Sequence, residues 1–179
     1  MARDRFGRES ALIVPGPAAE PVVGPWRENL DPACAWGVPA HITVLYPFVP
    51  PADIDQGVLD RLRLVLEAAP VFAFRLVAVE WFGDEVAWVR PEPKRNFLEL
   101  TERVSEAWPD HPPYEGAHAE VIPHLTICQG ADPDDMAAAA EAVDASLPID
   151  AEADRVHLMT GTRETDSWTT VAEFPLRSG

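Results

Sequence analysis

The amino-acid sequence predicts an α+β fold in which two similar lobes form one domain over residues 1–179. Hydrophobic residues make up 47% of the chain, which is enough for one substantial core. Short apolar runs typical of strands alternate with longer segments whose apolar residues recur at helical spacing. The order of these segments in the first half returns in the second half, which indicates a duplicated unit.

The first half begins with a strand that Pro15-Gly16-Pro17 ends. Asp53 is positioned to cap the second helix, and Gly83-Asp84 marks the turn of a β hairpin. In chain order, the expected elements are a strand at 11–14, a helix over about 19–30, a strand at 41–48, a helix over about 53–69, and hairpin strands at 72–81 and 86–89.

The second half repeats this order from the strand that Pro91-Glu92-Pro93 ends. Asp132-Pro133 is a start signal for its second helix, and Gly161 lies in the turn between the last two strands. The expected elements are a helix over 94–107, a Pro-rich loop over 109–121, a strand at 122–127, a helix from 132, and strands near 154–160 and 167–174.

Two stretches of the chain share a proline-led His-x-Thr pattern within an apolar run. They are Pro39-Ala40-His41-Ile42-Thr43-Val44 and Ile122-Pro123-His124-Leu125-Thr126-Ile127. Side chains two residues apart on a strand project from the same face, so each stretch presents an imidazole and a hydroxyl together. If the two lobes are related by a pseudo-twofold axis, each motif strand is the central strand of its lobe. His41 and His124 then face each other across one groove.

Two imidazoles and two hydroxyls around one groove are suited to cleaving a phosphodiester without a metal ion. A base must deprotonate the attacking oxygen, an acid must protonate the leaving oxygen, and donors must stabilise the charged phosphoryl oxygens. Two histidines can supply the base and the acid, because their ordinary pKa of about 6.5 allows either protonation state near neutral pH. Thr43 and Thr126 would be the donors.

The composition excludes several classes of protein. A formal net charge of −16, with Lys94 as the only lysine, opposes binding along a nucleic-acid polyanion. No apolar run is long enough to span a membrane, and no signal peptide is recognisable. Two isolated cysteines fit a reducing cytoplasm, and His111 and His118 lack partners at metal-ligand spacing. We therefore expect a cytoplasmic monomer without metal or other cofactor.

With these two motifs, their separation and the duplicated element order, the chain resembles the two-histidine (2H) phosphoesterase superfamily. Within it, the resemblance is to proteins described as 2′-5′ RNA ligase-like or as RNA 2′,3′-cyclic phosphodiesterases. The resemblance implies a bilobal fold with two antiparallel sheets lining a central cleft and helices outside. It also implies metal-independent hydrolysis of a 2′,3′-cyclic phosphate, on a nucleotide or an RNA end, to a 2′-phosphate. His41 and His124 would be the acid and base, and Thr43 and Thr126 the phosphate ligands.

Two features leave the substrate open. Many RNA-processing relatives carry an Arg or Lys shortly after the second motif, whereas this chain has Gln129, which favours a small nucleotide or an RNA end over a long RNA. Tyr114, in the loop before the second motif, is a candidate for stacking on a base and equally for packing on its own loop. The alternatives are a phosphodiesterase for 2′-5′ oligonucleotides, one for ADP-ribose 1″,2″-cyclic phosphate, and a nucleotide-binding module without turnover.

Overall fold

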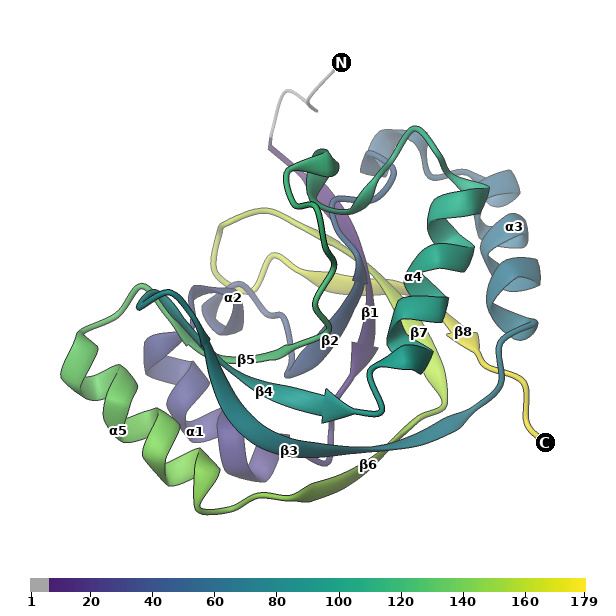
Figure 1. Ribbon diagram of the computed structural model, residues 1–179. Coiled ribbons are helices and arrows are strands. Elements are labelled where there is room, and N and C mark those ends of the chain that lie inside the picture. Colours follow the sequence, from purple (N-terminus) through teal and green to yellow (C-terminus); the bar gives the residue numbers. More distant parts are fainter. Residues whose placement is uncertain (1–6) are drawn as a thin grey trace.

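The computed structural model describes residues 7–179 and contains two four-stranded antiparallel sheets with helices packed outside them (Figure 1). Sheet 1 has the strand order β2 (His41–Leu45), β1 (Glu9–Pro15), β7 (Arg155–Gly161), β8 (Thr169–Pro175). Sheet 2 has the order β5 (Leu125–Gln129), β4 (Val86–Glu92), β3 (Phe72–Phe82), β6 (Ile149–Ala153). The expected α+β class with antiparallel sheets and outer helices is confirmed.

The long helices divide between the two sheets. The helices are α1 (Glu20–Leu30), α2 (Pro32–Ala35), α3 (Gln56–Glu67), α4 (Arg95–Ala107) and α5 (Pro133–Asp144), with 3₁₀ turns η1 (Pro51–Asp53) and η2 (Pro113–Gly116). Helices α3 and α4 pack on strands of sheet 1, and α1 and α5 pack on strands of sheet 2. Within residues 7–179, no helix has both the length and the apolar character needed to cross a membrane.

Two helix starts test the expected capping residues. The Asp132 carboxylate accepts the backbone N–H of Asp134 at 2.9 Å, so α5 begins where Asp132-Pro133 predicts. The expected cap at Asp53 is wrong, because this residue belongs to η1. Asp55 caps α3 instead, accepting the backbone N–H of Val58 at 2.9 Å.

The two halves of the chain exchange strands between the sheets. In the first half, β1 and β2 enter sheet 1, but β3 crosses to sheet 2 and pairs with β4 and β6. In the second half, β4 and β5 form sheet 2, but β7 returns to pair with β1. Each sheet therefore has the same local order, with a motif strand first, and contains strands from both halves.

The motif strands lie at one edge of each sheet, so the expectation that they are central strands is wrong. In sheet 1, β7 from the second half pairs with the side of β1 that is opposite β2. In sheet 2, β3 from the first half pairs with the side of β4 that is opposite β5, so β2 and β5 remain outermost. These two edge strands contact each other, and the sheets meet along them. Strand β6 had no counterpart among the expected elements, because its sequence Ile-Asp-Ala-Glu-Ala has weak strand propensity.

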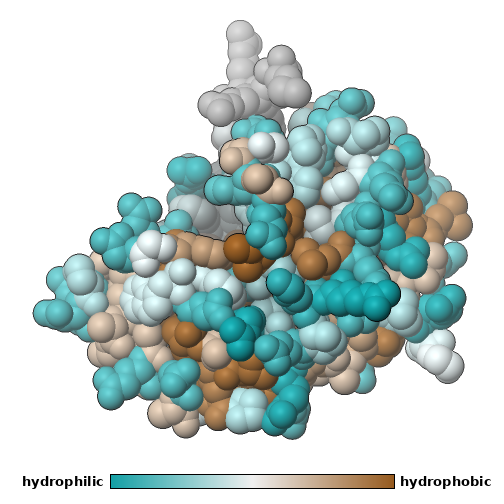
Figure 2. All heavy atoms as spheres, viewed as in Figure 1, coloured by the Kyte–Doolittle hydropathy of each residue, from teal (hydrophilic) through white to brown (hydrophobic). Residues whose placement is uncertain are grey.

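Alternate residues of each strand face different surroundings. On β1, Leu12 and Val14 join the main core under the helices, whereas Ala11 and Ile13 belong to a second apolar cluster on the opposite face. The motif strand β2 has the same alternation, with Ile42 buried in the main core. On the outside, the face shown in Figure 2 is largely hydrophilic, with apolar residues in separate small patches.

Candidate active site

The structure brings the two His-x-Thr motifs together where the sheets meet. His41 is the first residue of β2, and His124 immediately precedes β5. Strands β2 and β5 contact each other, so the two motifs converge where the sheets meet, as the sequence predicts. Burial lowers the pKa of His41, and the nearby charge of His124 acts in the same direction.

Both histidines are fixed in the same way by the chain that precedes them. The Nδ1 atom of His41 lies 2.7 Å from the carbonyl oxygen of Pro39, and Nδ1 of His124 lies 2.7 Å from that of Ile122. A carbonyl oxygen only accepts hydrogen bonds, so Nδ1 is the protonated nitrogen in each ring. Nε2 is then left with a free lone pair in both neutral rings, ready to accept a proton.

Burial keeps both rings neutral in the free protein. It lowers the pKa of His41 to about 4, assisted by the charges of Arg27 and His124 and opposed by the hydrogen bond to Pro39. Burial also lowers the pKa of His124. An anionic phosphate placed between the rings would raise both pKa values, because an opposite charge favours the protonated form. Binding of an anionic substrate therefore favours protonation of one imidazole, which can then act as the general acid.

A buried ion pair supports the approach to the first motif. The side chains of Arg27, on α1, and Asp31, directly after it, are 1% and 3% exposed, and Arg27 Nε lies 2.9 Å from Asp31 Oδ2. Arg27 Nη2 donates to the carbonyl oxygen of Val38 at 3.0 Å, three residues before His41. The backbone N–H of Ala40 donates to Glu20 of the same helix at 2.6 Å. Helix α1 therefore holds the backbone that carries His41.

Thr43 and Thr126 lie where the motif spacing predicts. Each follows its histidine by two residues and projects from the same strand face, and each is half-buried. Among the residues that the structure describes, neither hydroxyl has a hydrogen-bond partner. Both hydroxyls are therefore free to donate to a group between the two rings.

Two aromatic side chains of sheet 2 pack against His124. The Trp88 ring stacks on Phe82 with centroids 4.7 Å apart. The His124 ring meets both edge-to-face, at 5.0 Å from Phe82 and 5.9 Å from Trp88. Trp88 pairs with Thr126 across the β4–β5 ladder, so it shares the face of the motif. The two histidines thus have different neighbours, a buried cation near His41 and aromatic rings at His124.

The family-level assignment follows from a match along most of the chain. The family model described as the 2′-5′ RNA ligase superfamily matches residues 14–165. The chain belongs to this superfamily of 2H phosphoesterases. The match includes both His-x-Thr motifs and every element from α1 to β7.

Several solved structures share this fold. Escherichia coli LigT complexed with 3′-AMP has a TM-score of 0.61 at 16% identity, over 94% of this chain and 98% of that one. The protein TT0787 of Thermus thermophilus has a TM-score of 0.60 at 18% identity, over 95% and 98%. A protein described as a phosphoesterase has 0.58 at 18%, over 95% and 99%. No curated protein sequence matches the chain. These likenesses show the fold.

Gln129, where the resemblance to RNA-processing relatives implies a cation, ends β5 and is exposed. A cation that the sequence analysis did not identify lies on the neighbouring strand. Arg90 follows Trp88 by two residues on β4 and therefore projects from the same face as Trp88 and Thr126. Its guanidinium contacts the carboxylates of Glu80 and Glu92, so its charge is already compensated.

Tyr114 lies in η2, where its φ of 52° is in the left-handed region. Its backbone N–H donates to the carbonyl oxygen of Tyr46 at 2.6 Å, which attaches the loop to the end of the first motif strand. The ring meets His118 edge-to-face at 5.3 Å, and burial raises the pKa of the phenol. A role of Tyr114 in contacting substrate stays a prediction.

Two further residues considered from the sequence, His157 and Cys128, are placed where a structural role accounts for them. His157 on β7 lies 3.6 Å from Glu173, and Cys128 is buried in the main core. Within residues 7–179, the His, Cys, Asp and Glu side chains form no cluster of three or more that could hold a metal ion. The structure adds Arg27 and Trp88 to the neighbourhood of the motifs, and the sequence gives only a weak indication of either. Arg27 has an acidic partner four positions on, and Trp88 lies in a strand that pairs with a motif strand.

Proposed function

We propose that this protein is a metal-independent phosphodiesterase that hydrolyses a 2′,3′-cyclic phosphate, on a nucleotide or an RNA end, to a 2′-phosphate. The observation that supports it most directly is the matched geometry of His41 and His124, each donating from Nδ1 to a carbonyl two residues earlier. This leaves two Nε2 atoms as the proton-transfer positions. Membership of a superfamily of 2H phosphoesterases supports the same class of reaction.

In the proposed reaction, Nε2 of one histidine removes a proton from a water molecule as the water oxygen attacks phosphorus. The bond between phosphorus and the 3′ oxygen breaks, and Nε2 of the other, protonated histidine gives its proton to that oxygen. The products are a 2′-phosphate and a free 3′ hydroxyl, and one water molecule has been added. Thr43 and Thr126 donate to the non-bridging oxygens while negative charge develops on them.

The site has no cation at Gln129, directly after the second motif, and Arg90 is compensated, which leaves neighbouring reactions open as alternatives. These are hydrolysis of a linear 2′-5′ oligonucleotide and opening of ADP-ribose 1″,2″-cyclic phosphate. The non-catalytic alternative is a module that binds a 2′-nucleotide and turns over none of these substrates.

A substrate panel tests the proposal. Wild type, His41→Ala and His124→Ala are assayed with EDTA present on 2′,3′-cyclic nucleotides, a cyclic-phosphate-ended RNA, a 2′-5′ dinucleotide and ADP-ribose 1″,2″-cyclic phosphate. His118→Ala, a change at an exposed histidine outside the motifs, is the matched control. We expect each motif substitution to lower kcat by about a hundredfold or more. Full turnover in either folded motif variant, or no turnover of any cyclic substrate by wild type, contradicts the proposal.

A further inference from the structure

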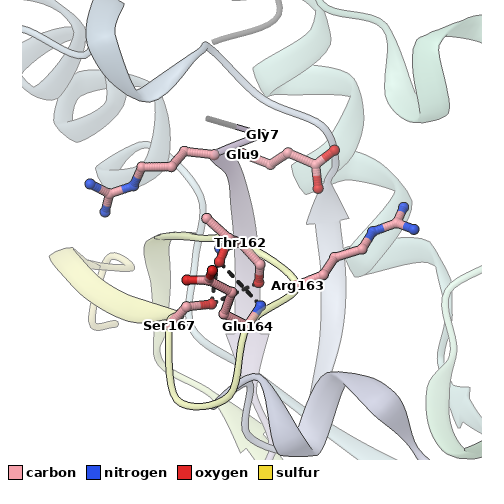
Figure 3. Close-up of a pocket in the computed structure, with 7 residues that line it drawn as sticks. Gly7, Glu9, Thr162, Arg163, Glu164 and Ser167 are labelled. Carbon is pink, nitrogen blue, oxygen red and sulfur yellow. Dashed lines mark hydrogen bonds between the residues drawn. The ribbon is translucent and has the colours of Figure 1, made fainter. Parts of the chain in front are cut away.

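A cavity of about 900 Å³ lies between the start of β1 and the turn that joins β7 to β8. Figure 3 shows side chains that line it, and they include Arg8, Glu9, Thr162, Arg163, Glu164 and Ser167. We call this space the β7–β8 cavity.

The β7–β8 cavity opens on the same face of sheet 1 as the first motif. Glu9, Ala11 and Ile13 alternate on β1, and the β1–β7 pairing is regular from Glu9 to Ile13, so the three side chains share one face. Ile13 pairs with Thr43 of the motif strand. The hydrogen bond of 2.6 Å from the Tyr46 hydroxyl to Glu9 joins the end of the motif strand to the cavity on this face.

The separation between this cavity and the motif follows from strand geometry. Glu9 is four residues from Ile13, the partner of Thr43, and a strand rises about 3.3 Å per residue. The cavity edge at Glu9 is therefore about 13 Å from the level of Thr43. A buried apolar cluster that includes Ala11, Met159 and Trp168 fills the interval, and the partly exposed rings of Trp36 and Tyr46 pack against it. These two rings suit the apolar faces of a base or ribose better than they suit a phosphate.

Arg163 is the group in this cavity best placed to bind an anion. Its guanidinium lies 5.8 Å from the centroid of the Trp36 ring and close to the Tyr46 hydroxyl. Figure 3 shows Arg163 and Glu9 extending toward the same side of the cavity, but no ion pair joins them among the described residues. The carboxylate of Glu9 instead accepts the Tyr46 hydroxyl.

The turn that carries Arg163 is held by its own hydrogen bonds. Ser167 donates to the carbonyl oxygen of Thr162 at 2.7 Å, and its hydroxyl accepts the backbone N–H of Thr162 at 3.0 Å. The backbone N–H of Trp168 donates to the carbonyl oxygen of Trp36 at 2.8 Å, which anchors the turn beside α2. Arg163 therefore projects from a fixed support, with Arg8 as a second cation and with Glu9 and Glu164 as opposing charges in the lining.

We propose that the β7–β8 cavity is a subsite for a second phosphate of the substrate, the internucleotide phosphate upstream of the reacting end, and that Arg163 is its principal ligand. This inference rests on the proposed function, because it places the reacting phosphate between the two motifs. It makes the preferred substrate a short oligonucleotide end, and a cyclic mononucleotide without a 5′-phosphate a poorer one. A guanidinium recognises phosphate through charge-assisted hydrogen bonds, and one such contact changes affinity by about tenfold.

The test measures binding and turnover along a series of ligands. Binding is measured with 2′-phosphate-ended RNA of one, two and three nucleotides, and with a mononucleotide that carries a 5′-phosphate. Turnover is measured with the corresponding 2′,3′-cyclic phosphates. The proteins are wild type, Arg163→Ala and Arg95→Ala, which removes an exposed arginine from α4, outside the cavity lining.

We expect the di- or trinucleotide to bind wild type and Arg95→Ala about tenfold more tightly than a mononucleotide without a 5′-phosphate. Arg163→Ala should lose this gain, with less than about a twofold change for that mononucleotide, which places no phosphate in the cavity. Equal affinity for all lengths in wild type, or an unchanged gain in Arg163→Ala, overturns the subsite. The 5′-phosphate alone should give a mononucleotide most of this gain, because the internucleotide phosphate upstream of the reacting end is esterified to the same 5′ oxygen. No gain from the 5′-phosphate therefore also overturns the subsite. Binding decides the subsite even if no cyclic phosphate is hydrolysed, a result that would contradict the proposed function alone.

Discussion

Replacing His41 with asparagine should remove a specific part of the dependence of protein stability on pH. Burial holds the pKa of His41 at about 4 in the folded protein, against 6.5 for a histidine in water. Between these two values the unfolded chain binds a proton that the folded protein excludes, so stability falls as the pH falls. One pKa unit corresponds to about 1.4 kcal/mol, and the stability that wild type loses through His41 between about pH 7.5 and 5.0 is therefore about 2 kcal/mol.

The assay compares urea unfolding of wild type and His41→Asn at several values between about pH 5.0 and 7.5, the range in which the unfolded histidine titrates. Asparagine retains a side-chain N–H donor near the position of Nδ1, so the hydrogen bond to Pro39 can persist. We expect the free energy of unfolding of wild type to fall by about 2 kcal/mol more than that of the variant over this range. Parallel curves for the two proteins would refute the reasoning, as would an NMR titration in which the pKa of His41 is that of a histidine in water.

Substitutions at three buried positions, Arg27, Gly161 and Thr101, test contacts that stabilise the fold around the two motifs and the β7–β8 turn. Arg27→Met leaves Asp31 buried without its partner and should cost about 3–5 kcal/mol of unfolding free energy. Arg27→Met with Asp31→Leu should recover most of that loss, and equal losses in both variants would contradict the role of the ion pair. Gly161→Ala places a Cβ 2.6 Å from Trp168 Cα and should destabilise by about 1–3 kcal/mol in urea unfolding. An unchanged midpoint would show that the turn relaxes at no cost. Thr101→Val removes a buried hydroxyl that donates to the Val44 carbonyl oxygen at 2.7 Å, and thermal unfolding should show a loss of about 1–3 kcal/mol. A loss as large in Thr101→Ser would assign the effect to packing.

The sequence predicts the elements that carry periodic apolar residues and the meeting of the motifs. Helices α3, α4 and α5 follow the spacing of their buried residues. His41 and His124 meet because the duplicated order implies equivalent positions in two sheets. Their orientation also follows from the chain, since each ring bonds to a carbonyl two residues earlier.

Other features depend on contacts that local patterns do not encode. The apolar alternation of β3 is the same whether the strand pairs with β1 or with β4, so the exchange of strands is invisible in the sequence. An arginine within a helix is usually exposed, so the sequence alone predicts an exposed Arg27. Only the packing of the helix shows that this side chain is buried. Trp88 and Arg90 reach the site through the pairing of β4 with β5, which decides the face that each presents.

The exchange of strands makes each half of the polypeptide incomplete as a folding unit. A fragment that ends after β3 lacks the β7 partner of β1 and the β4 partner of β3, so it would expose unpaired backbone on both strands. Two copies of such a fragment could satisfy these edges by trading their third strands, as in a domain-swapped dimer. In the intact chain both partners are covalently linked, so the pairing that completes each sheet is independent of protein concentration.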